Sequence, residues 1–300
     1  MNRALVFLAA SAAAALAVTS ACLAKTEPNR DFRADEIHFT MTAPARSGDV
    51  QLSLRSGRRH HNNGMTSSFA ASELAGLDLS RLRSPASTPL SFALVRQAGR
   101  VDCVGNARAM RAEGDCRFTA DAAFANLLAS HGIGRPTEEE AYGLTIVGAT
   151  RDLVEALAAA NYPRPTVEKL TELAAVGVDR QFIDQLSRRG YRPNDLGELV
   201  EFGALDISPA YIAELARMGY SGLSPDEVTQ LKALEVTPEF VEGFARIGYK
   251  NLPVDTLVQL KALDVTPAYV TSLRDRGLAE LSPEQLVAMK AIGDHRGRRK

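Results

Sequence analysis

The sequence predicts an α+β protein, in which a small antiparallel β domain is followed by an α-solenoid, a stack of repeated helix pairs. Two observations predict this order. Short alternating segments punctuated by glycines fill the first part of the chain, and a repeat of 29 residues fills the second. A fixed period between about 20 and 50 residues is typical of solenoids and helical arrays. A third observation, an apolar N-terminal segment, predicts that the protein is exported.

The N-terminal residues 1–24 have the features of a secretory signal peptide. Arg3 supplies a positive charge, an alanine-rich apolar run follows from Ala4 to Val18, and small residues lead to Ala24. Cleavage after Ala24 releases a soluble protein, whereas cleavage before Cys22 gives a lipoprotein. An uncleaved anchor is a third alternative, because residues 4–24 are just long enough to span a bilayer. In each case we expect an exported bacterial protein of the periplasm or outer envelope, touching the membrane only through this N-terminus.

Residues 25–35 are polar and are assigned to a linker, and residues 36–120 are assigned to the β domain. The expected strands are Glu36–Met41, Asp49–Ser56, Met65–Phe69, Ser91–Arg96, Gly99–Gly105 and Gly114–Thr119. Their connections are too short for parallel crossovers, so we expect antiparallel pairing. Asn63-Gly64 predicts a type I′ hairpin turn before the third strand. Ser72–Ser84 predicts short helical turns.

Cys103 and Cys116 form a candidate disulfide, because an exported protein folds in an oxidising compartment. Two unpaired thiols on separate strands are the alternative. A bridge between these residues would close a short loop and restrain the unfolded chain by roughly 3 kcal/mol.

A connecting helix is expected within residues 121–135, and the repeats occupy residues 136–293. Ser224–Leu252 and Pro253–Leu281 agree at 12 of 29 positions. Each unit holds two short helices with their own capping residues. The first helices are expected to begin at Thr137, Thr166, Asp195, Ser224, Pro253 and Ser282. The second helices are expected to begin at Thr150, Asp179, Ser208, Thr237 and Thr266. Ser224 with Glu227, and Ser282 with Gln285, predict capping boxes.

The second helix of each unit is expected to stop at a residue that tolerates the left-handed conformation. These residues form a helix-stop ladder: Asn161, Gly190, Gly219, Gly248 and Gly277. Apolar residues recur at i, i+3 and i+4 in both helices, which predicts one buried face per helix. Because helices of about ten residues are marginal alone in water, stability is expected to come from stacking between repeats. Residues 294–300 are basic and are assigned to a solvated tail.

Two ladders of cations recur at the repeat spacing, namely Lys232, Lys261 and Lys290, and Arg188, Arg217 and Arg246. One interpretation makes them a charged stripe that docks an acidic partner. The other, which we favour for each ladder, is that cations late in a helix complement its dipole and pair with nearby carboxylates.

Two other short segments contain residue types that occur in binding sites. Arg58–His61 could contact a metal or an anion at a hairpin tip, but the interpretation that we favour is a solvated tip, because adjacent histidines on a strand point to opposite faces. Gly132–Gly134 lacks the preceding strand of a phosphate-binding loop and is assigned to a connector. We therefore expect no metal site and no cofactor. The net charge of −1 argues against a dedicated nucleic-acid binder.

The repeat unit LKALxVTPEYVxxLxxxGYxxLSPDxL, present here at Leu231–Leu257, resembles the repeats of bacterial exported or envelope proteins. It is similar to the extracytoplasmic repeats attached to membrane metallopeptidases of the beta-lactam-sensing antirepressor type. Gln51–Phe118 also resembles this group, although its members tend to carry an aromatic residue where Cys103 and Cys116 stand. The resemblance spans Gln51 to Ile292, and the peptidase motif HExxH is missing.

The repeats, the signal peptide and the absence of a catalytic constellation in the sequence together favour a non-enzymatic interaction module, a scaffold or adaptor, whose protein partner in the envelope is unknown. A regulatory or sensory component that works with an antirepressor-type peptidase is the alternative, implied by the resemblance alone. An enzyme with residues scattered over the fold is the third and least favoured hypothesis.

Overall fold

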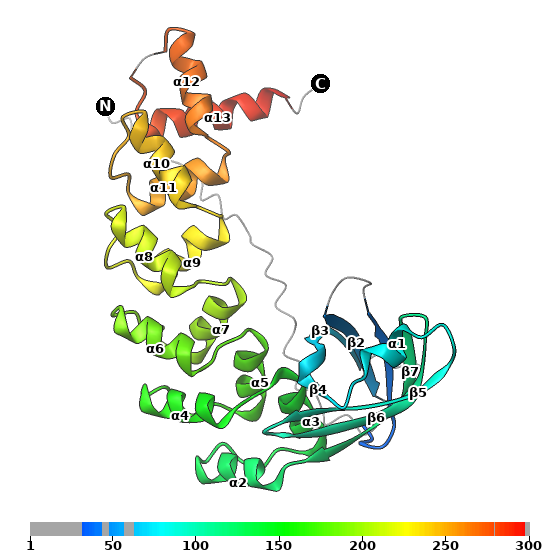
Figure 1. The fold of residues 1–300 in the computed structure, drawn as a ribbon. Helices are drawn as coiled ribbons and strands as arrows, with labels where there is room; N and C mark the ends of the chain where they lie inside the picture. The colour runs from blue at the N-terminus through cyan, green and yellow to red at the C-terminus, as the bar shows by residue number, and fades with distance from the viewer. Residues whose placement is uncertain (1–31, 44–47, 57–62, 279, 298–300) are drawn as a thin grey trace, which may run out of the picture.

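The computed structural model describes residues 32–43, 48–56, 63–278 and 280–297. The predicted signal peptide, Cys22, Arg58–His61 and the start of the linker lie outside these ranges. The architecture is α+β, as predicted: a curled antiparallel sheet at the lower right of Figure 1 is followed by helices that rise away from it.

Seven strands form the described sheet, in the order β3-β2-β1-β7-β6-β5-β4, with every neighbouring pair antiparallel. They are β1 Ile37–Thr42, β2 Asp49–Ser56, β3 Asn63–Ala70, β4 Leu74–Ala75, β5 Thr88–Arg96, β6 Gly99–Arg108 and β7 Arg111–Ala120. β1 lies between β2 and β7, so the first strand pairs with the last strand, which forms a hairpin with β6. A 3-10 turn, Ala71–Glu73, and a short helix α1, Leu79–Arg83, occupy the stretch predicted to hold helical turns.

The predicted hairpin turn at Asn63-Gly64 is wrong. Both residues belong to β3, where Asn63 pairs with Ser56 and Gly64 pairs with Arg55. Two-residue turns join β5 to β6 and β6 to β7, and in the second of these Ala109 and Met110 have φ of 48° and 70°. Backbone hydrogen bonds from Ala109 to Ser84 and from Met110 to Leu82 hold these residues in a conformation that L-residues otherwise avoid.

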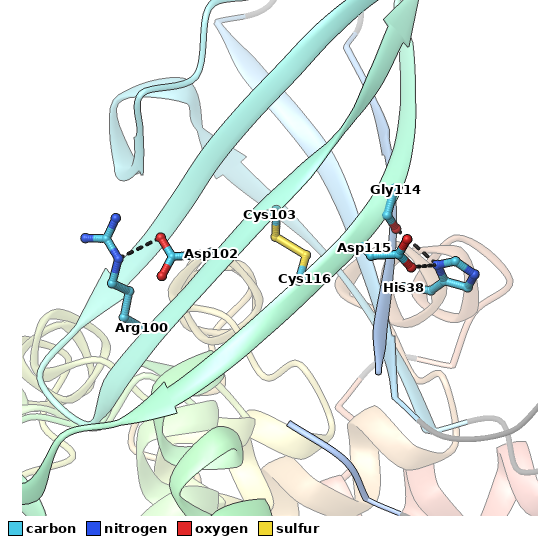
Figure 2. Close-up of a disulfide and its surroundings, with 7 residues drawn as sticks. All are labelled: His38, Arg100, Asp102, Cys103, Gly114, Asp115 and Cys116. Carbon is cyan, nitrogen blue, oxygen red and sulfur yellow. Dashed lines mark hydrogen bonds and ion pairs between the residues drawn. A yellow bond between two sulfur atoms is a disulfide. The ribbon is translucent and has the colours of Figure 1, made fainter. Parts of the chain in front are cut away.

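The disulfide between Cys103 and Cys116 is present, as predicted (Figure 2). The two residues are direct cross-strand partners on β6 and β7, and both are buried. They belong to an apolar core inside the curl of the sheet, in which the rings of Phe39 and Phe92 pack edge to face at 5.1 Å.

Next to the disulfide, β6 and β7 come together at two facing glycines, Gly105 and Gly114. A Cβ atom on Gly105 would lie 2.1 Å from the carbonyl oxygen of Glu113. Only glycine allows this close approach of the two strands.

Part of the predicted linker is not a linker. The Phe32 ring lies 5.2 Å from the Tyr142 ring of the helical region, and the Ala34 carbonyl accepts a hydrogen bond from the Phe118 amide. The aromatic side chain of Phe32 buries apolar surface, which anchors residues 32–35 to the sheet.

Twelve helices follow within the described part of the chain. They are α2 Ala122–Ser130, α3 Glu138–Val147, α4 Arg151–Ala159, α5 Val167–Ala175, α6 Arg180–Arg188, α7 Leu196–Ala204, α8 Pro209–Arg217, α9 Pro225–Ala233, α10 Pro238–Arg246, α11 Val254–Ala262, α12 Pro267–Asp275 and α13 Pro283–Gly297. The predicted first residues of α3 to α12 are their N-caps, and each except Pro253 accepts a backbone N–H through its side chain. The capping boxes at Ser224 and Ser282 are confirmed.

The helices pack in two layers. The odd-numbered helices from α3 to α13 each contact the next odd-numbered helix, and α2, α4, α6 and α8 form a second series, which α10 and α12 continue (Figure 1). One apolar core runs between the layers, from Phe124 in α2 to Leu286 in α13. At the base, α3 packs on β5, β6 and β7 and places Ala141 and Ile146 in the core of the sheet.

The end of the chain differs from the prediction. α13 continues through Gly297, so the first residues of the basic tail assigned to 294–300 are helical. No helix within the described ranges is both long and apolar enough to cross a bilayer.

Gly248 ends α10 with φ of +100°, and no atom lies within 4 Å of the position that a Cβ would occupy. Because space is free, a substitution is opposed by the backbone conformation alone. We expect Gly248→Val to lower the free energy of unfolding of the helical region by at least ~1 kcal/mol, and Gly248→Asn to cost much less, since Asn161 has φ of +55° at the equivalent position. Urea denaturation of both variants measures the difference. Equal midpoints would show that the left-handed conformation of Gly248 has no energetic importance.

Candidate interaction surface

The segments that follow α4, α6, α8, α10 and α12 each contain a residue of positive φ at the same repeat position. All five residues of the predicted helix-stop ladder have positive φ, between 55° and 100°. The connections that follow α3, α5, α7, α9 and α11 contain a second ladder of positive φ, formed by Gly148, Gly177, Asp206, Glu235 and Asp264. Each repeat therefore turns at the same two places, which keeps equivalent residues in equivalent positions.

The segments that follow the even-numbered helices are connectors, and tyrosine hydroxyls hydrogen-bond the connectors after α8 and α10 to the backbone 32 residues further on. Tyr220 donates to the carbonyl of Leu252 at 2.7 Å, and Tyr249 donates to that of Leu281 at 2.6 Å. Burial raises the pKa of the Tyr191 phenol, and a hydrogen bond from the Leu223 backbone to the phenol oxygen opposes that rise, so this tyrosine is linked to the next connector as an acceptor. An arginine links the connectors after α4 and α6, because the Arg192 guanidinium donates to the carbonyl of Asn161 at 2.7 Å.

We define the connector edge as residues 157–165, 186–194, 215–223 and 244–252, the last turn of α4, α6, α8 and α10 with the connector that follows each. The hydrogen bonds described above join these four segments in series, so they form one continuous edge of the helical region. All of its tyrosines are half-buried.

The connector edge carries only positive charge. Its four segments contain seven exposed cations and no aspartate or glutamate. The cations are Arg164, Arg188, Arg189, Arg192, Arg217, Arg246 and Lys250. The last repeat departs from this pattern, because Asp275 and Glu280 offset its two arginines and Leu278 replaces the tyrosine.

Two grooves on this edge are lined by equivalent residues. One, of about 230 Å³, lies between α8 and α10 and is lined by Tyr220, Val241, Ala245 and Tyr249, among others. The other, of about 270 Å³, is lined at the same repeat positions by Ile133, Val154, Ala158 and Tyr162. Their residues are 87 positions apart, three times the repeat length. The two grooves are therefore lined by residues at the same positions of the sequence repeat.

The two predicted ladders of cations occupy different environments. Arg188, Arg217 and Arg246 are exposed on the connector edge. The Arg217 and Arg246 guanidinium groups donate to backbone carbonyls one turn earlier, and Arg217 lies 3.8 Å from the Glu214 carboxylate. These contacts complement the helix dipole and leave the guanidinium groups accessible to solvent.

The lysines pack between repeats instead. Lys232 lies 4.9 Å from the centre of the Tyr211 ring, Lys261 lies 5.2 Å from that of Phe240, and Lys290 lies 4.9 Å from that of Tyr269. Each ring belongs to the preceding even-numbered helix. Burial raises the pKa of the Tyr211 phenol to about 12, and this hydroxyl donates to the Val236 carbonyl at 3.0 Å. We therefore assign the lysine ladder to cation–π packing between repeats.

A second candidate site lies on the outer face of the sheet. A hollow of about 500 Å³ is lined by His38, Asp115 and Glu113, with Gly105 and Gly114 among its other residues. The His38 imidazole lies 2.6 Å from the Asp115 carboxylate, and both side chains are about three-quarters exposed (Figure 2). An ion pair this exposed contributes little stability and has no fixed geometry. Within the ranges that the structure describes, no group of three or more metal-ligating side chains comes together.

Tyr162, Tyr191, Tyr220 and Tyr249 recur in the sequence at the 29-residue spacing, but the contact of Tyr220 could not be predicted locally, because its acceptor carbonyl is 32 residues further on. The exclusively positive charge of the four segments was visible in the sequence. These charges form one positive surface only because the four connectors lie next to one another in the folded protein.

We expect Tyr220→Phe to lower the free energy of unfolding of the helical region by about 1 kcal/mol, because the Leu252 carbonyl loses its donor. Ser221→Ala, at an exposed neighbouring position, is the control and should change it by less than about 0.5 kcal/mol. Chemical denaturation of both variants measures the difference. Equal effects would mean that the hydroxyl does not tie the connectors together.

No known protein family matches this chain, and no curated protein resembles it in sequence.

Proposed function

We propose that this protein is a non-enzymatic, exported interaction module, in which residues 136–293 act as an α-solenoid of 29-residue helix pairs. The observation that carries the proposal is the connector edge, where hydrogen bonds between successive repeats hold equivalent side chains in a continuous row. Stacked repeats produce extended surfaces of this kind, and such surfaces bind other macromolecules.

Export to the periplasm or outer envelope is the second part of the proposal. It is supported by the signal-like residues 1–24 and by the buried disulfide, since disulfides persist in oxidising compartments. The resemblance of the repeat unit to those of bacterial envelope proteins points to the same compartment.

Site-specific photocrosslinking in intact cells tests the proposal. A photoreactive residue is placed at Ser221, exposed in the connector after α8, and in a control at Val104, which is 64% exposed on β6. We expect a discrete adduct with one envelope protein from position 221 and none from position 104. The proposal is wrong if position 221 and the corresponding exposed positions of the other connectors give no adduct.

A further inference from the structure

We infer that the connector edge binds an extended, acidic polypeptide segment whose apolar side chains enter the grooves between repeats. This inference rests on the proposed function and specifies the chemistry of the partner.

Charge complementarity is the first argument. The chain as a whole has a net charge of −1, yet the connector edge carries seven exposed cations and no carboxylate. The charge of these segments is balanced outside them, in part by carboxylates one turn earlier on the helices, such as Glu214 and Glu242. A row of like charges on one surface attracts a segment of opposite charge and accelerates its association.

The grooves supply the second argument. Val241, Ala245 and the rings of Tyr220 and Tyr249 make the groove between α8 and α10 mostly apolar, and one cation, Lys250, and one carboxylate, Glu242, lie on the same lining. The groove lined by Val154 and Tyr162 has Arg164 at its lining. An apolar side chain of the bound segment would be buried in each groove, and carboxylates on either side of it in that segment would pair with the cations of the connector edge.

The repeat spacing sets the pattern of the segment. Packed helices lie about 8–10 Å apart, so equivalent positions recur at roughly that distance per repeat. An extended chain advances about 3.3 Å per residue. An apolar residue at every third position, separated by acidic residues, therefore stays in step with the repeats, and about ten residues span the four connectors and reach both grooves, which lie three repeats apart.

The edge is already organised for binding. The hydrogen bonds from Tyr220 to Leu252 and from Arg192 to Asn161 fix the connectors before any partner arrives. Binding then does not bear the entropic cost of ordering them. Recessed grooves favour a polypeptide over an anionic membrane, because side chains can enter a recess that a bilayer surface would cover.

Fluorescence anisotropy with the secreted, disulfide-bonded chain tests the inference. The probe is a labelled peptide of about 12 residues that repeats Leu-Glu-Glu, matched to the spacing above. We expect saturable binding that weakens as salt is raised. A peptide repeating Leu-Lys-Lys should not bind, and one repeating Ser-Glu-Glu should bind more weakly, because it lacks apolar anchors.

Two variants with the same change in net charge locate the site. Arg188→Glu with Arg217→Glu and Arg246→Glu reverses three cations of the connector edge, and we expect affinity to fall about tenfold or more. The control is Arg55→Glu with Arg111→Glu and Arg117→Glu, all exposed on the sheet, which should leave affinity within about twofold. Ala158→Trp with Ala245→Trp fills both grooves at unchanged charge and should weaken the Leu-Glu-Glu peptide more than the Ser-Glu-Glu peptide.

Three results would overturn the inference. They are absence of peptide binding, an equal loss in the two charge-reversed variants, and binding to vesicles of phosphatidylglycerol and phosphatidylcholine in place of the peptide. The cellular crosslinking separates this inference from the proposed function. If the adduct at position 221 persists undiminished in the variant reversed at Arg188, Arg217 and Arg246, a partner binds but the acidic segment is not how it is recognised.

Discussion

Replacing both cysteines, Cys103→Ala with Cys116→Ala, is expected to lower the free energy of unfolding of the β domain by about 3 kcal/mol. The bridge joins residues 13 apart in the sequence. Cross-linking them lowers the conformational entropy of the unfolded chain, which raises the free energy of the unfolded state relative to the folded one. Because the pair lies between β6 and β7 in the middle of the sheet, the loss should appear in the whole sheet.

Urea denaturation with and without reductant measures this effect. Reductant should destabilise the wild-type protein and leave the double variant unchanged. A change of less than about 1 kcal/mol in the double variant would mean that the bridge contributes little and that packing inside the curl is sufficient. Without reductant, neither cysteine of the disulfide-bonded wild-type protein should react with a thiol-labelling reagent.

Phe244→Ala is expected to have the largest effect in the helical region, about 3–5 kcal/mol. The Phe244 side chain is fully buried, and its ring contacts those of Phe240 and Tyr249, at 5.1 Å and 6.2 Å between centroids. The substitution leaves a cavity between neighbouring repeats. Since each helix buries its apolar face only against its neighbours, the loss should extend to α8 and α12.

Hydrogen exchange resolves this effect along the chain. Amides of α8 to α12 should lose protection, while those of β1, β6 and β7 should not. Leu278→Ala, at a side chain that is 41% exposed, is the control and should cost less than about 1 kcal/mol. Equal protection of α8 in the wild-type and Phe244→Ala proteins would contradict the dependence of each repeat on the next.

The start of each helix could be predicted from local sequence, because a capping side chain bonds to backbone amides within the first turn of its own helix. Thr150, Asp179 and Ser208 each satisfy a backbone amide three residues on, and this chemistry is written in the sequence. The acidic members of the second positive-φ ladder, such as Glu235 with φ of 54°, carry no such signal.

The sheet was less predictable for a physical reason. The turn at Ala109-Met110 depends on hydrogen bonds to residues of α1 and just beyond it, and Asn63-Gly64 is held in β3 by its pairing with β2. Tertiary contacts override local turn preference in both places. The position of β1 between β2 and β7 likewise depends on pairing between distant segments. The same is true of the connector edge, where the Tyr220 hydroxyl meets its acceptor only when the repeats stack.

The location of the proposed binding surface is tested most directly by hydrogen exchange on the full chain, with and without the Leu-Glu-Glu peptide at saturation. The peptide should slow exchange in residues 157–165, 186–194, 215–223 and 244–252 and leave β1 to β7 unchanged. Slowed exchange confined to the sheet, or to the ends of the helices opposite the connector edge, would contradict the assignment of this edge as the surface that binds a partner.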